Sequence, residues 1–114
     1  MINYNEAFNS ARLVPGAHKY ISDWKKNAEN FRNSMLEQSK AEIDFEYSDK
    51  EDCKMDIFNP GPYAKASMIF LHGGFWTDYN KSYFSHLAMG PVLNDIRVVI
   101  PDLPKCPNFT IPEI

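Results

Sequence analysis

A pair of glycines directly after an apolar run is the feature of this sequence that is best suited to a catalytic or ligand-binding role. The run Met68–Leu71 is followed by His72–Trp76, which reads His-Gly-Gly-Phe-Trp. Adjacent glycines at the end of a strand let the backbone turn sharply and approach a ligand closely. Backbone N–H groups at such a turn can bind an oxyanion, which is usually the largest single contribution to acyl transfer. The segment predicts an oxyanion-binding loop, with His72 as a brace and Phe75 and Trp76 as pocket walls. The alternative is a plain strand-to-helix turn with a buried histidine.

The sequence lacks the motifs that would complete a phosphate site or a nucleophile. No Gly-Lys-Ser/Thr follows the glycines and no G-x-G-x-x-G occurs, which disfavours a phosphate-binding loop. None of the five glycines has a serine two positions away, so these 114 residues contain no G-x-S-x-G turn. Cys106, between Lys105 and Pro107, is interpreted as an ordinary loop thiol, and Cys53 as a residue at a strand end.

Metal ligation is not predicted either. His18, His72 and His86 lie far apart and lack the spacing of metal ligands, so we expect no metal. Asp102 directly follows the last predicted strand, a location that often faces a ligand in α/β sheets. We interpret it as a hydrogen-bonding residue of its loop.

Two kinds of periodicity precede the loop. Apolar residues recur at spacings of three and four behind Pro15 and Gly16, which predicts an amphipathic helix over residues 17–38. The period then changes to two. Residues 43–47 and 53–57 alternate between apolar and polar types on either side of a polar turn, which predicts an antiparallel hairpin with half-buried strands.

The loop itself lies between two apolar strands. Met68–Leu71, at the end of a strand over residues 66–71, and Val98–Ile100 are continuously apolar, as in strands covered on both faces. Residues 82–93 carry an apolar face and predict a helix, with Pro91 near its end. A strand, a helix and a strand form a crossover unit, so the two strands should be parallel and the fold class is α/β.

Composition restricts the classes of partner. The chain has 114 residues, enough for one domain, and a formal charge of −3. This charge does not favour binding to nucleic acid or to a membrane surface. The N-terminus lacks the basic start and apolar stretch of a signal peptide, and no apolar run is long enough to span a bilayer. With two cysteines and no disulfide framework, we expect a reduced, cytoplasmic protein.

The last residues predict the N-terminal end of a helix. Thr110, Pro112 and Glu113 have the spacing of a capping box with proline in the first turn. Two parallel strands also need more helices than the chain supplies to cover both faces of their sheet. We therefore expect this sequence to be the N-terminal part of a larger domain; the alternative is a polar loop at the end.

The motif and its surroundings resemble the kynurenine formamidase (arylformamidase) group of α/β-hydrolases. Leu71–Trp76 is similar to the HGG-x-W signature of that group, and Asn80–Ala88 to its D-K-S-x-F-S-x-L-A helix start. Further similar segments, in chain order, are Asn9–Pro15, Asp56–Phe58, Val99–Asp102 and Cys106–Ile114. The resemblance covers nearly the whole chain. Pro104–Lys105 departs from it by replacing a more apolar pair.

The resemblance implies a fold and a role for the loop. Residues 1–114 would be a single incomplete α/β-hydrolase domain, with an N-terminal helical segment over 1–40 and the first four strands, including the oxyanion loop, over 41–114. Gly73, Gly74 and the Phe75 N–H would form the oxyanion hole, and Phe75 and Trp76 would line the substrate pocket. The Ser, Asp and His of the catalytic triad would lie downstream, and the resemblance implies no metal and no organic cofactor.

Three hypotheses for function remain open. The first is an enzyme, the N-terminal part of a serine hydrolase that cleaves small formamides or carboxylic esters and is inactive as this chain alone. Its partners would be a small-molecule ester or amide substrate and either a second copy or a complementing chain. The second is a non-catalytic interaction module that associates through an exposed sheet edge. The third is a truncated product without function.

Overall fold

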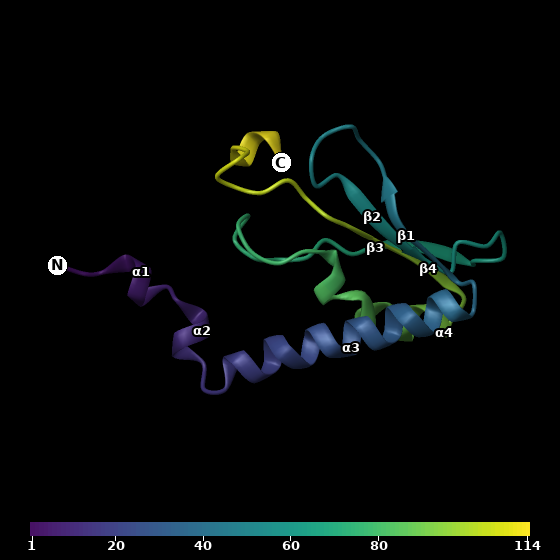
Figure 1. Ribbon diagram of the computed structural model, residues 1–114, viewed down its shortest axis with the longest axis horizontal. Coiled ribbons are helices and arrows are strands. Elements are labelled where there is room, and N and C mark those ends of the chain that lie inside the picture. The colour runs from purple at the N-terminus through teal and green to yellow at the C-terminus, as the bar shows by residue number, and fades with distance from the viewer.

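A long helix, α3 (Ala17–Glu37), runs along one face of a four-stranded sheet (Figure 1). The computed structural model describes residues 1–114. Two one-turn helices, α1 (Tyr4–Ala7) and α2 (Ser10–Leu13), precede α3 and lead away from the sheet. None of the helices combines the length and the apolar character that a membrane crossing requires.

Helix α3 confirms the predicted amphipathic helix over residues 17–38. It begins behind Gly16, whose φ of 76° is left-handed and favours glycine. Its buried side chains are Ala28, Phe31 and Met35, so the spacing of three and four does select the face that meets the sheet. The core joins this face to the sheet and to the crossover segment through Phe31, Met35, Phe58, Ala88, Val98 and Ile100.

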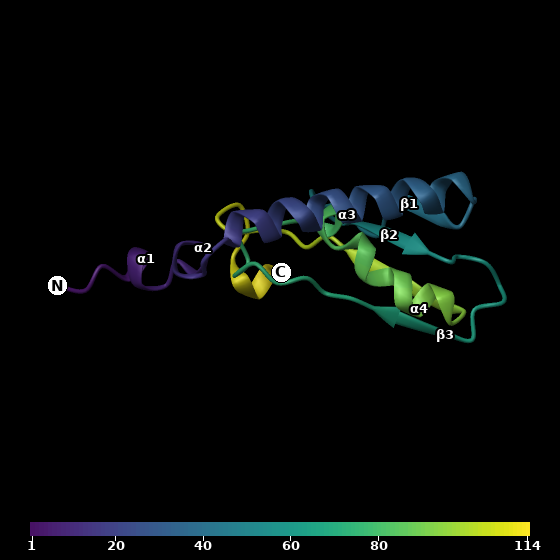
Figure 2. The same cartoon turned by 90° about the horizontal axis from the view of Figure 1, so that it is seen from below.

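The sheet contains the predicted hairpin and the predicted parallel pair. Its strands are β1 (Ala41–Glu46), β2 (Lys54–Phe58), β3 (Ala66–Ile69) and β4 (Ile96–Pro101), in the order β1-β2-β4-β3. β1 and β2 are antiparallel, β2 and β4 are antiparallel, and β3 and β4 are parallel. Helix α3 and the crossover segment share one face of this sheet (Figure 2). The molecule is therefore a mixed α/β protein.

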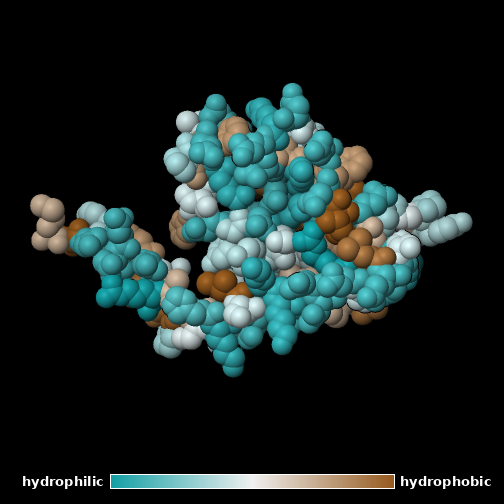
Figure 3. All heavy atoms as spheres, in the orientation of Figure 1, coloured by the Kyte–Doolittle hydropathy of each residue, from teal (hydrophilic) through white to brown (hydrophobic).

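The prediction that both apolar strands are covered on both faces is wrong for β3. β4 is central and buries Val98 and Ile100 completely, but β3 is an edge strand that pairs with β4 alone. Ile69 is 67% exposed and Leu71, just after the strand, is 61% exposed. The core contains side chains of β2 and β4 and none of β3, which explains this exposure. Apolar residues also reach the surface among hydrophilic ones on the face in Figure 3.

The predicted continuous helix over residues 82–93 is also wrong. The structure has two short 3₁₀ helices, η1 (Lys81–Tyr83) and η2 (Ser85–Ala88), followed by α4 (Met89–Leu93). Pro91 has no N–H and its ring would clash with the carbonyl of Leu87 in a continuous α-helix. Proline is tolerated in a first helical turn, and α4 accordingly begins only two residues before Pro91.

A β-bulge interrupts the alternation in β1. The register of β1 against β2 shifts between Glu42 and Phe45, and Asp44 has a φ of 58°. Ile43 packs against the core, whereas Phe45 is 50% exposed and Tyr47 is 42% exposed. An extra residue changes which face the following side chains occupy, so the alternating pattern did not place Phe45 correctly.

The capping box predicted at the end of the chain is confirmed. A single 3₁₀ turn, η3 (Ile111–Glu113), follows Thr110. The Thr110 N–H donates to Glu113 Oε2 at 2.8 Å. This hydrogen bond, together with the one from the Thr110 hydroxyl, holds the pKa of Glu113 below its usual value.

Candidate functional site

The loop behind β3 has an unusual backbone. Gly74 has a φ of 127°, and the non-glycine residues Phe75, Trp76 and Tyr79 have φ values of 51°, 60° and 66°. A bulky residue in the left-handed region costs about 1–3 kcal/mol and persists only when its surroundings hold it there. The Gly74 carbonyl accepts from the N–H groups of Thr77 and Asp78, at 3.0 and 2.9 Å. The sequence motif gave no sign of these left-handed aromatic residues.

The backbone N–H groups from Leu71 to Trp76 have no acceptor in the chain, and all of them lie outside every helix and strand. This run includes Gly73, Gly74 and Phe75, the three donors that the sequence analysis assigned to an oxyanion hole. Gly73 and Phe75 are exposed, so these N–H groups can bond to water or to a ligand.

A pocket of about 450 Å³ lies beside these donors. It joins the loop after β3 to the loop after β4 and to the last residue, and its lining consists of His72, Gly73, Gly74, Phe75, Trp76, Asp78, Leu103, Pro104, Lys105 and Ile114. Phe75 is 79% exposed and Trp76 is 52% exposed, so the predicted aromatic walls border an open pocket. Sequence reasoning did not place Lys105 or Ile114 there, because both reach the pocket only through the fold.

The two glycines have different surroundings. A Cβ on Gly74 would lie 2.2 Å from the Asp78 carbonyl oxygen and 3.1 Å from the Tyr79 ring. A Cβ on Gly73 would meet nothing within 4 Å. Only Gly74 therefore requires glycine on steric grounds, in addition to its φ.

The His72 side chain lies against the loop and is 4% exposed. Its Nδ1 donates to the Gly73 carbonyl oxygen at 2.7 Å, since a carbonyl can only accept. Its Nε2 lies 3.7 Å from Asp102 Oδ1, and its ring stacks on Phe84 with centroids 5.4 Å apart. His72 thus contacts both the loop and the segment after β4.

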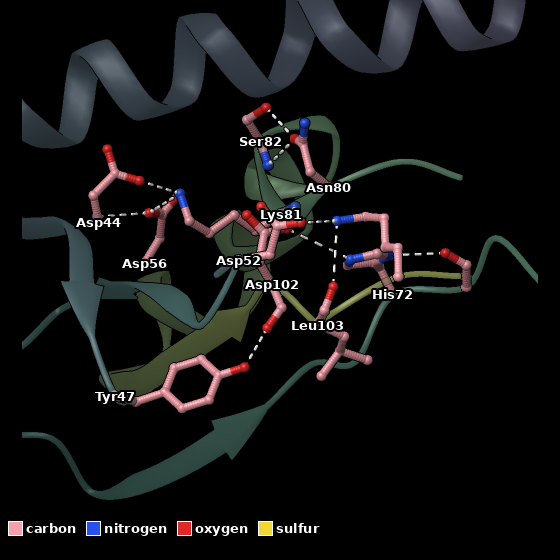
Figure 4. Close-up of polar contacts among 12 residues, drawn as sticks. Asp44, Tyr47, Asp52, Asp56, His72, Asn80, Lys81, Ser82, Asp102 and Leu103 are labelled. Carbon is pink, nitrogen blue, oxygen red and sulfur yellow. Dashed lines mark hydrogen bonds and ion pairs between the residues drawn. The ribbon is translucent and has the colours of Figure 1, made fainter. Parts of the chain in front are cut away.

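The Asp102 side chain accepts a hydrogen bond, but the donor belongs to η1, whereas the sequence analysis expected one in the loop of Asp102. Its Oδ1 accepts from the Lys81 N–H at 2.7 Å (Figure 4). Burial raises the pKa of Asp102, but the opposing effects of His72, the Lys81 N–H and the cations Lys105 and Lys81 outweigh burial and hold the pKa below its usual value.

Acid should weaken this contact. Because the folded pKa of Asp102 lies below the unfolded value of 3.8, its stabilisation is present above about pH 3.8 and is lost as pH falls through the folded pKa. We expect the backbone amide resonance of Lys81 to shift in that acidic range in an NMR titration. Asp102→Asn should remove the shift and Asp95→Asn, on the surface, should keep it. A shift that survives Asp102→Asn would contradict the assignment.

A buried group of charges was missed by sequence reasoning. Lys81 Nζ lies 2.8 Å from Asp56 Oδ1 and 2.5 Å from Asp44 Oδ1 (Figure 4). Arg32 Nη2 of α3 lies 3.2 Å from Asp56 Oδ2. Asp56 is completely buried and Lys81 is 4% exposed. The alternation in β2 indicated a solvent-facing Asp56.

The other candidate residues stay apart from the pocket. Cys53 is buried, and Cys106, a free thiol, contributes its N–H to the Trp76 carbonyl oxygen at 2.8 Å. His18 is exposed, and burial lowers the pKa of His86. No group of three His, Cys, Asp or Glu side chains is arranged to hold a metal ion.

The fold and the site together define a mixed α/β protein with a strained loop and a pocket at the end of a parallel strand. A solved structure from Silicibacter sp., described as a "putative thioesterase", matches it with a TM-score of 0.83 and 34% sequence identity. The match covers 96% of this chain and 41% of that chain, so this chain spans less than half of its solved neighbour. No protein-family model and no curated protein matches.

Proposed function

We propose that this chain is the N-terminal part of an α/β-hydrolase domain and that its loop Gly73–Phe75 forms the oxyanion hole of a serine hydrolase. The observation that carries this proposal is the run of free N–H donors that includes Gly73, Gly74 and Phe75, at the edge of a pocket of about 450 Å³. The similarity to a putative thioesterase supports a hydrolase of acyl compounds. The resemblance to arylformamidases supports the same class.

The loop would act on the charge that develops during acyl transfer. Attack by a serine oxygen on an acyl carbonyl turns the carbonyl oxygen into an anion, and the free N–H groups would bind that anion. Removing one such donor typically lowers kcat by about 10²–10³-fold. The serine would come from outside these 114 residues, because they contain no G-x-S-x-G.

The pocket lining suggests the class of acyl substrate. Phe75, Trp76, Leu103 and Ile114 give it an apolar wall, which suits an aromatic or aliphatic group. Small formamides, carboxylic esters and thioesters share the carbonyl that the loop would bind. Measuring kcat/KM of the native protein for one formamide, one carboxylic ester and one thioester would rank these three substrate classes.

We expect the isolated 114-residue chain to be inactive, because it supplies donors but no nucleophile. The test is intact mass spectrometry of the native product from source cells after treatment with a fluorophosphonate probe. A species well above 13.2 kDa that gains the probe mass supports a serine hydrolase that includes this chain. A labelled species at 13.2 kDa would show that the chain holds its own nucleophile and would contradict the proposal. An unlabelled species at that mass would also count against it.

The exposed edge of β3 favours a second candidate, a non-catalytic interaction module. An edge strand presents unpaired backbone groups to another strand, and Ile69 adds an apolar side chain beside them. Analytical ultracentrifugation of the native product separates the candidates. A stable complex without any fluorophosphonate labelling supports the module, and a labelled monomer excludes it.

A further inference from the structure

We propose that Lys81 is a positioning residue for the oxyanion loop, acting through the η1 turn, Phe84 and His72. This inference rests on the proposed function of the loop, but it concerns the loop's geometry and is tested without catalysis. Lys81 lies in η1, between β3 and β4, and does not line the pocket. Its effect on the loop must therefore pass through its contacts.

The side chain of Lys81 anchors its turn to the sheet. Its ammonium contacts Asp56 of β2 and Asp44 of β1, and Arg32 of α3 contacts Asp56 from the other side. The group contains two cations and two anions, so its formal charges balance. The Asp44 N–H also donates to Asp56 Oδ1 at 3.1 Å, which fixes the bulge that brings Asp44 to Lys81.

A buried group of this kind is better suited to fix a position than to add stability. Taking charges out of water is costly, and well-packed apolar side chains often stabilise a core as well or better. The hydrogen bonds of the Lys81 ammonium to its two carboxylates are directional, however, and loss of the buried Asp56 partner would leave a buried charge unpaired. The structure accordingly holds the Lys81 backbone at one place relative to β1 and β2.

The backbone of the same residue carries this position to the segment after β4. The Lys81 N–H donates to Asp102 Oδ1 at 2.7 Å, and Asn80 caps the turn by accepting from the Ser82 N–H at 3.0 Å. A movement of the η1 turn would therefore lengthen the contact to Asp102.

The η1 turn then holds His72 through Phe84, which lies just after η1 and stacks on the His72 ring with centroids 5.4 Å apart. Asp102 Oδ1 lies 3.7 Å from His72 Nε2, which is beyond hydrogen-bond distance. The other ring nitrogen donates to the Gly73 carbonyl oxygen. The carbonyl of Gly73 belongs to the peptide unit whose N–H is that of Gly74, so its orientation sets the direction of one proposed oxyanion donor.

The test compares Lys81→Met with Lys65→Met in the 114-residue chain. Both substitutions remove a lysine from an ion pair, but Lys65 pairs with Asp95 on the surface at 2.9 Å. NMR would record the ¹⁵N shifts of the His72 ring, the hydrogen-exchange protection of the position-81 amide, and the heteronuclear NOEs of Gly73 and Gly74. We expect Lys81→Met to move the His72 signals, to lower the protection at least tenfold and to reduce the NOEs. Lys65→Met should change none of them.

A purely structural role predicts a different result. If Lys81→Met lowers the unfolding temperature and leaves the His72 and glycine signals unchanged, the proposal is wrong. If Lys81→Met does not fold, Asp44→Asn decides, because Asp44 has a 58% exposed side chain and can be replaced without leaving a buried gap. Smaller shifts of the His72 ring signals in Asp44→Asn support the proposal, and unchanged His72 signals in that variant overturn it. The two proposals can fail separately. If Lys81→Met disorders the loop but the native protein is not labelled by the fluorophosphonate probe, the positioning role is retained and the proposed function is rejected.

Discussion

Gly74→Ala is expected to abolish acyl transfer in the native protein that carries the nucleophile. A Cβ at this position would lie 2.2 Å from the Asp78 carbonyl oxygen, and that atom belongs to the backbone and cannot rotate away. The φ of 127° is also one that alanine rarely adopts. The loop must therefore change its path, which moves the N–H groups of Gly74 and Phe75 together. Since each donor is worth about 10²–10³-fold, kcat should fall by at least about 10²-fold.

Gly61→Ala, at a glycine outside the loop and the pocket, is the matched control for this prediction. Its Cβ would meet no atom within 4 Å, and its φ is not in the left-handed region. Steady-state kinetics on the same ester or thioester should show a kcat close to that of the unchanged protein. Equal losses in the two variants would contradict the steric argument, and full activity of Gly74→Ala would remove the assignment of this loop as the oxyanion hole.

Phe58→Ala is expected to have the largest effect on stability. Phe58 is completely buried in β2 and packs against Phe31 of α3, with ring centroids 5.2 Å apart. Truncating a buried phenylalanine typically lowers the free energy of unfolding by about 3–5 kcal/mol. The total free energy of unfolding of a small domain is about 5–15 kcal/mol, so this loss is a large part of it. We expect the cooperative thermal transition, followed by circular dichroism, to disappear or to shift far downwards.

Phe45→Ala provides the comparison within the same sheet. Phe45 lies in β1, has the same side chain and is 50% exposed because of the bulge. Surface substitutions usually change stability by about 0.5 kcal/mol or less, and this half-exposed residue should stay close to that range. A destabilisation by Phe45→Ala as large as that by Phe58→Ala would show that the core is not where the structure places it.

The elements with a clean period could be predicted from the sequence. Helix α3 was found within one residue at its C-terminal end, because Ala28, Phe31 and Met35 mark its buried face locally. The hairpin and the parallel pair followed from alternation and from the order of strand, crossover and strand. These features depend on neighbours in the chain, which a sequence pattern records directly.

The errors arose where distant contacts or backbone geometry decide. The pattern over residues 82–93 looks helical, but Pro91 restricts the α-helix to its last turn and a half. Ile69 looks buried by type, but its strand is at an edge, which only the strand order reveals.

The candidate site was predictable in its local part only. His72–Trp76 stands out as a motif, and its role as an oxyanion loop stays a prediction. Lys105 and Ile114 reach the pocket from segments some thirty or more residues away, and Lys81 meets Asp56 only after η1 packs on the hairpin. No local spacing encodes such encounters. The left-handed φ of Phe75 and Trp76 is equally hidden, because their types do not favour that conformation.

The strand order has a consequence for how the chain folds as it leaves the ribosome. β4, which lies between β2 and β3 in the sheet, is synthesised after both of them, so Phe58 cannot pair with Val98 until β4 has emerged. Until then the hairpin can close alone, but β3 has no strand to pair with and α3 has only part of its core to cover. Nascent chains released or stalled before Ile96 would expose these apolar surfaces together, which makes them substrates for chaperones during that interval.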